Sequence, residues 1–178
     1  MPRKARPKRL TARITHLEME RTPPLRVAAP IGIRLALMRP HRITLPFYRF
    51  LYEQVGKPHH WLLRRNATDD DLAAAIHSPM TEIEVLYADG SPAGFYELAL
   101  EELPETVEIR YFGLTPQAQG RGLGRFLLSE AIFSGFAHAP RKLRIQTNTL
   151  DSPRALQLYQ KMGFSPVGWS EETVEPWE

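Results

Sequence analysis

The chain has 178 residues, a net charge of +3 and ordinary apolar content, which predicts one compact domain. It has no cysteine, so disulfides, cysteine nucleophiles and thiolate metal sites are excluded. No apolar stretch approaches the ~20 residues of a membrane helix, and the basic N-terminus lacks the apolar core of a secretory signal. We therefore expect a cytoplasmic protein that does not enter a membrane.

The positive charge is concentrated at one end of the sequence. Six lysines and arginines, and no acid, lie within residues 1–13, so the rest of the chain has slightly more acids than bases. This composition predicts a disordered basic tail over residues 1–13, followed by a single domain over residues 14–178. Clustered cations can bind nucleic acid by releasing counterions, but the tail has no aromatic residue to stack on bases. We favour a solubilising terminus without a nucleic-acid partner.

The first half of the chain predicts few regular elements. Loose alternation favours a first strand over residues 13–20, and five prolines make residues 22–46 an irregular loop. Within that loop, residues 33–38 form one short extended piece. Apolar residues at helical spacing predict a helix over residues 47–55, which ends at Gly56. A second, short helix is expected from Thr68, a capping residue, to Ile76.

The second half of the chain alternates more regularly. An Asp89-Gly90 turn joins two strands into a hairpin, and a further strand extends it to an antiparallel meander. Gly163 ends the last predicted helix, and the acidic residues 171–178 are expected to fray. The predicted strands lie at residues 82–88, 94–100, 106–114, 142–147 and 164–169, and the predicted helices at 122–136 and 153–162. This order of elements predicts an α+β fold.

A glycine-rich run, Gln119-Gly120-Arg121-Gly122-Leu123-Gly124, precedes the helix at residues 122–136. The first-turn amides of a helix are unpaired and its dipole is positive there, so a glycine turn at this position favours phosphate. The spacing does not match the dinucleotide fingerprint, because residue 125 is arginine, and it lacks the Gly-Lys-Ser/Thr ending of a P-loop. The run therefore predicts a phosphate site of another kind.

The motif Gln119-x-x-Gly122-x-Gly124, after a strand at residues 107–114, resembles the pyrophosphate-binding motif of the GNAT superfamily of N-acetyltransferases. Residues 155–164 are similar to a second family signature, A-x-x-L-Y-x-x-x-G-F. The resemblance covers roughly residues 80–170. It implies a GNAT-like fold, with a mixed, mostly antiparallel central sheet flanked by helices. It also implies transfer of an acetyl group from acetyl-coenzyme A to a primary amine in a ternary complex.

The resemblance implies where acetyl-coenzyme A binds. Backbone amides of the glycine run are expected to hold the diphosphate, and the strand before it to lie along pantetheine, with Gly113 suited to a bulge. Ser152 stands where many family members have asparagine, and Asn148 is a candidate to replace it. No metal is expected. The expected cofactor-binding residues are Phe112, Gly113, Leu114, Gln119, Gly120, Arg121, Gly122, Leu123, Gly124, Arg125, Asn148 and Ser152.

Two catalytic roles follow from the same resemblance. Glu108 is the expected general base, drawing a proton from the amine through a water molecule, and Glu97 is the second candidate. Tyr159 is the expected acid, which protonates or hydrogen-bonds the sulfur of coenzyme A.

The variable first half is expected to bind the acceptor. Tyr48, Tyr52, Trp61 and Glu97 are tentative substrate residues, and Arg64 and Arg65 are candidates to bind a carboxylate or phosphate of the acceptor. The sequence leaves open whether the acceptor is a small-molecule or a peptide amine, and whether the protein is a homodimer. The alternative function is a non-catalytic domain that binds or senses acyl-coenzyme A.

Overall fold

The computed structural model describes residues 9–177, which form a single seven-stranded sheet with helices on both faces. The strand order is β2-β3-β4-β5-β6-β1-β7, and among these strands only β5 and β6 are parallel neighbours. The elements are β1 (Leu10–Met19), β2 (Leu35–Met38), α1 (Leu45–Gly56), η1 (Lys57–His59), α2 (Asp69–Ile76), β3 (Thr81–Ala88), β4 (Ser91–Ala99), β5 (Thr106–Leu114), η2 (Pro116–Ala118), α3 (Leu123–Phe136), β6 (Lys142–Asn148), α4 (Ala155–Lys161) and β7 (Ser165–Val174). The predicted α+β fold with a mixed, mostly antiparallel sheet is confirmed.

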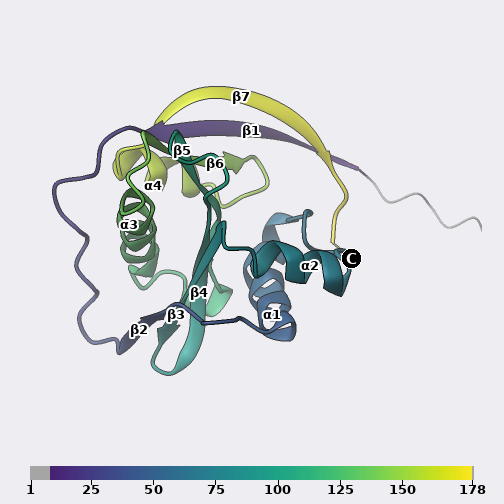
Figure 1. Cartoon of the computed structure of the whole chain (residues 1–178), viewed down its shortest axis with the longest axis horizontal. Helices are drawn as coiled ribbons and strands as arrows, with labels where there is room; N and C mark the ends of the chain where they lie inside the picture. The colour runs from purple at the N-terminus through teal and green to yellow at the C-terminus, as the bar shows by residue number, and fades with distance from the viewer. Residues whose placement is uncertain (1–8, 178) are drawn as a thin grey trace, which may run out of the picture.

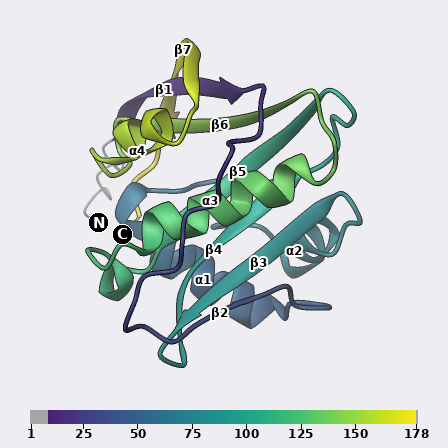
Figure 2. The same ribbon diagram turned by 90° about the vertical axis from the view of Figure 1, so that its left-hand side faces the viewer.

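Two hydrophobic cores lie on opposite faces of the sheet. Helices α1 and α2 cover one face, while α3 and α4 cover the other (Figures 1 and 2). Leu127, Leu128 and Ile132 of α3 are fully buried in one core, because α3 is apolar on the side that faces the sheet. Tyr48 and Leu51 of α1 are fully buried in the other. No helix within residues 9–177 is long and apolar enough to cross a membrane.

The first and last strands are longer than the sequence predicts. Strand β1 starts at Leu10, and its first residues pair with Val174 and the acidic residues before it in β7, which were expected to fray. Residues 1–8 of the predicted tail lie outside the described residues. Local sequence does not show this pairing because each segment is polar by itself and its partner lies at the other end of the chain.

Strands β5 and β6 diverge halfway along their length. Their pairing ends at Ile109 and Ile145, although β6 continues to Asn148 and β5 to Leu114. A bulge in β5 begins at the same point, since successive residues of β4 pair with Tyr111 and Ile109 and leave Arg110 without a partner there. The divergence opens the sheet from one face to the other.

The prediction of a bulge at Gly113 is wrong, because Gly113 pairs regularly with Phe95 of β4. The glycine is required for a different reason. A side chain at this position would collide with Val55, through which α1 packs closely against β5.

Candidate active site

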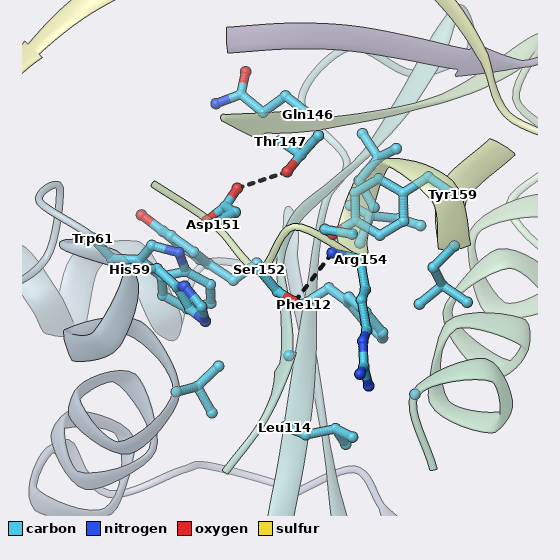
Figure 3. Close-up of a pocket in the computed structure, with 18 of the residues that line it drawn as sticks. His59, Trp61, Phe112, Leu114, Gln146, Thr147, Asp151, Ser152, Arg154 and Tyr159 are labelled. Carbon is cyan, nitrogen blue, oxygen red and sulfur yellow. Dashed lines mark hydrogen bonds between the residues drawn. The ribbon is translucent and has the colours of Figure 1, made fainter. Parts of the chain in front are cut away.

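A cavity of about 870 Å³ occupies the gap between the diverging strands. It is bordered by α3, α4 and the glycine run at one end, and by α1 and the loop after η1 at the other. Figure 3 shows His59 and Trp61 on one side of the cavity and Arg154 and Tyr159 on the opposite side. The cavity therefore runs from the glycine run at the start of α3 to the side chains of α1 and of the loop after η1.

The glycine run forms a tight turn that exposes backbone amides at the start of α3. Gly120 and Gly122 have φ values of 75° and 76°, which residues with a side chain rarely adopt. Within residues 9–177, no carbonyl accepts a hydrogen bond from the amides of residues 120–122. Gln119, Gly120, Gly122, Leu123 and Gly124 line the cavity. Unpaired amides at a helix start bind anions well, so this end suits a phosphate group.

The arginines near this turn point in different directions. Arg121 does not line the cavity, because its guanidinium lies 2.9 Å from the Oδ2 atom of Asp89 in the β3–β4 hairpin. The amide of Arg34 and then the Arg121 side chain donate to this carboxylate and lower the pKa of Asp89. Arg125 lines the cavity, and so does Arg154, just before α4. Sequence reasoning missed Arg154, although a cation directly before the second signature was a usable signal.

Tyr159 borders the middle of the cavity. Its ring packs against Phe112 of β5 with centroids 6.1 Å apart, and its hydroxyl makes no hydrogen bond within residues 9–177. Burial, reinforced by the charge of Asp151, raises the pKa of Tyr159 well above its usual range. The phenol therefore keeps its proton at neutral pH and can donate a hydrogen bond into the cavity.

Polar side chains fix the loop between β6 and α4. The Oδ1 atom of Asn148 accepts from the amides of Leu150 and Asp151, at 2.8 and 3.1 Å. The Oδ2 atom of Asp151 accepts from the Thr147 hydroxyl and from the Asn148 amide, both at 2.9 Å. The Ser152 hydroxyl accepts from the amide of Arg154. Asn148 and Ser152 both line the cavity, so these bonds set the shape of its wall.

The two expected bases do not line this cavity. Glu108 lies 3.6 Å from Arg144 and borders a separate cavity of about 200 Å³, and Arg110 lines both cavities. Glu97 is fully buried beneath α1. The structure thus brings Tyr159 and the glycine turn together, but not the two glutamates.

Glu97 forms a buried ion pair with Arg64. Its Oε2 atom accepts from Arg64 at 2.6 Å and from the Tyr48 hydroxyl at 2.7 Å, and all three side chains are buried. Burial alone would lower the pKa of Arg64, but the Glu97 carboxylate raises it above its ordinary value. Burial raises the pKa of Glu97, against the opposing charge of Arg64. The two short hydrogen bonds argue that the pair is charged.

His59 lines the cavity, although no role was expected for it from the sequence. Its Nδ1 atom lies 3.2 Å from the carbonyl oxygen of Leu150. A carbonyl only accepts hydrogen bonds, so Nδ1 carries the hydrogen and the neutral ring has its basic lone pair on Nε2. This orientation suits a proton acceptor, and only the folded structure reveals it, because Leu150 is distant in sequence.

The end of the cavity opposite the glycine turn has an apolar wall. Tyr52 and Trp61 are part of it, as the sequence analysis suggested, whereas Tyr48 lies beneath it. Ring centroids lie 5.4 Å apart between Tyr52 and Trp61, and 5.0 Å apart between Trp61 and Tyr111. The apolar wall consists of Tyr52, Val55, Trp61, Leu62, Leu63 and Tyr111.

Trp177 fastens the loop that carries this wall. Its backbone amide lies 3.1 Å from the Nδ1 atom of His60, and its indole N–H donates to the Trp61 carbonyl at 2.7 Å. Arg65 stacks over the indole ring at 5.3 Å and donates to the Glu175 carbonyl. These contacts hold the loop in the position that completes the cavity.

Comparison with known proteins agrees with this arrangement. A model of the acetyltransferase (GNAT) family matches residues 41–164. The mycothiol acetyltransferase of Jonesia denitrificans is 35% identical over 74 residues, which cover 42% of this chain and 23% of that protein. The chain thus matches under a quarter of the length of this curated relative.

Two solved structures show the same fold. A putative GNAT-family acetyltransferase from Novosphingobium aromaticivorans has a TM-score of 0.63 and 17% identity, over 92% of this chain and 64% of that one. A GNAT-family acetyltransferase from Elizabethkingia anophelis, with acetyl-coenzyme A bound, has a TM-score of 0.56 and 21% identity. The match covers 78% of this chain and 79% of that one.

The diverging strands and the glycine turn define an acyltransferase-type fold. Because the family model matches well over half of its residues, the chain belongs to the GNAT acetyltransferase family.

Proposed function

We propose that this protein is an N-acetyltransferase that transfers an acetyl group from acetyl-coenzyme A directly to a primary amine. The observation that carries the proposal is the exposed glycine turn, which opens into a cavity that passes through the sheet between β5 and β6. A donor can enter from the α3 side and an acceptor from the α1 side, so both fit at once. Direct transfer in a ternary complex requires no covalent enzyme intermediate.

The residues of the α3 side suit the donor. The amides of residues 120–122 would hold the diphosphate, with Arg125 and Arg154 as cations beside it. Phe112, Gly113 and Leu114 would lie along the pantetheine arm, because this part of β5 has no partner on its β6 side. Acetyl-coenzyme A supplies the activated acetyl group as a thioester.

The chemical step needs charge stabilisation and two proton transfers. As the amine nitrogen bonds to the carbonyl carbon and the carbon–sulfur bond breaks, amides of β5 would stabilise the negative oxygen. Tyr159 would donate its hydrogen bond or proton to the departing thiolate. The amine proton would pass to a base, which leaves the free thiol of coenzyme A and the amide as products.

Two residues are candidates for this base. Glu108, expected from the sequence, would have to act through water that passes Arg110, because the carboxylate borders the smaller cavity. His59 lines the large cavity itself and has its basic nitrogen free. Turnover by Glu108→Gln and His59→Gln variants distinguishes them: the base is the residue whose loss lowers kcat on the order of 100-fold.

The donor site is tested by calorimetric titration of coenzyme A. Gly120→Ala should weaken binding about tenfold, because a side chain is strained at this φ and the turn must change shape. Gly32→Ala is the matched control, since Gly32 also has a positive φ and no atom near the added methyl group. Absence of binding to the unaltered protein would refute the proposed function.

The alternative function is a non-catalytic domain that binds or senses acyl-coenzyme A. It predicts coenzyme A binding without thiol release in the presence of any amine. The cytoplasmic location stays a prediction from the sequence, which left open whether the protein is a homodimer.

A further inference from the structure

We propose that the acceptor is a primary amine with an aromatic or branched aliphatic body and without a carboxylate or phosphate near the amine. The proposal rests on the proposed function and narrows its substrate class. Three features of the α1 end of the cavity carry it: an apolar wall, arginines that are already engaged, and carboxylates that face the same space.

The apolar wall is built to contact a hydrophobic group. Three of its members are aromatic rings that pack against one another, and the other three are Val55, Leu62 and Leu63. Leu63 is 81% exposed although it borders the cavity, so its side chain is available to a ligand. Small-molecule sites combine such apolar walls with a few polar groups that fix orientation.

The arginines near the α1 end are engaged elsewhere, and Arg125 and Arg154 are the cations that we assign to the donor diphosphate. Arg64 is buried and bonded to Glu97, and the guanidinium of Arg65 lies over Trp177. Arg110 lines the cavity but is paired with Glu101, with a nitrogen–oxygen distance of 3.3 Å. A carboxylate against the apolar wall would therefore lose water without gaining a free cation in return.

Acidic side chains at the same end favour a cation. Asp151 and Glu172 both line the cavity, from the β6–α4 loop and from β7. A protonated amine approaching this end would be attracted, whereas an amino acid would bring a second, repelled charge. The structure thus discriminates by the group beside the amine.

The test measures kcat/KM by thiol release for pairs of acceptors that differ only in a carboxylate. Suitable pairs are 2-phenylethylamine with phenylalanine, tryptamine with tryptophan, and isoamylamine with leucine. In each pair, the amine without the carboxylate should be favoured by on the order of tenfold or more.

A gain-of-function variant locates the discrimination. Leu63→Arg places a cation at the exposed edge of the apolar wall, where substitution should not disturb folding. It should raise kcat/KM for the carboxylated member of each pair and so reduce the ratio of kcat/KM between the two members. Leu25→Arg is the matched control, because Leu25 is also 81% exposed but does not line the cavity.

The outcomes separate this inference from the proposed function. Equal or better use of the carboxylated acceptors would overturn the inference. Turnover of no acceptor in the panel, with coenzyme A still bound, would overturn it as well. Loss of coenzyme A binding itself would instead refute the proposed function.

Discussion

Tyr159 is the expected catalytic residue that the structure places at the cavity. It was selected from the second signature, and α4 places its hydroxyl at the cavity beside Phe112. A motif on one short helix is read reliably because its spacing fixes which residues share a face.

Removal of the Tyr159 hydroxyl should affect chemistry more than binding. In Tyr159→Phe, kcat should fall on the order of 100-fold, because the thiolate loses its proton donor. The KM for acetyl-coenzyme A should stay nearly constant, since the ring and its packing are kept. Tyr87→Phe, on β3 away from the cavity, is the control and should leave steady-state kinetics unchanged. Unaltered kcat in Tyr159→Phe would exclude the acid role.

Glu108 shows where a strand residue escapes prediction from sequence. Alternation assigns residues to the two faces of a strand, but a single bulge changes the facing of every residue beyond it. The bulge in β5 lies at Arg110, within the segment that carries the expected site residues. The sequence indicates that the strand contributes to the site, but not which of its side chains reach the cavity.

The buried pair of Arg64 and Glu97 should be costly to break. Arg64→Met should lower the free energy of unfolding by about 3 kcal/mol, because it leaves the Glu97 charge buried without a partner. The double variant Arg64→Met/Glu97→Leu should recover much of this loss. Chemical denaturation of the two single variants and the double variant measures the coupling, and strict additivity would show that the two side chains do not interact.

The loop from Lys57 to Arg65 carries part of the apolar wall that we propose binds the acceptor. It has little regular structure, and its position is set by contacts with Trp177. The helices were easier to anticipate: Thr68 caps α2, and α1 ends at Gly56 as expected. The loop was not predictable, because its shape depends on a tryptophan more than a hundred residues further along the chain.

Removal of the Trp177 ring should loosen this loop. In Trp177→Ala, the KM for the acceptor should rise about tenfold as the apolar wall becomes disordered, while the affinity for coenzyme A is kept. Trp169→Ala is the matched control: Trp169 is 60% exposed on β7 and does not line the cavity. Equal effects of the two substitutions on acceptor KM would show that Trp177 has no special part in the site.

At the scale of the whole molecule, both ends of the described chain enter the same sheet. Strand β1 pairs with β6 on one side and with β7 on the other. The meander of β3, β4 and β5 was predicted because its turns are short and local. The pairing of β1 was not, since it joins segments far apart in sequence whose patterns are individually weak.

Hydrogen exchange tests this pairing. Amides of Ile14 to Leu17 should exchange as slowly as those of β4, because β1 has a hydrogen-bonded neighbour on each side. Amides on the outer side of β7 should exchange faster, since β7 has only β1 as a neighbour. Rapid exchange throughout residues 10–19, measured by mass spectrometry on the purified protein, would contradict the strand order.

The place of β1 between β6 and the edge strand β7 constrains which truncations of the chain the fold can tolerate. Strand β1 supports β6, which carries the cavity residue Thr147, through the pairing along residues 14–19. A deletion of residues 10–19 would separate β6 from β7 and leave strand edges without hydrogen-bonded partners, which favours self-association. Affinity tags and fusions on the N-terminal side should therefore join before Leu10, so that β1 keeps its pairing with both neighbours.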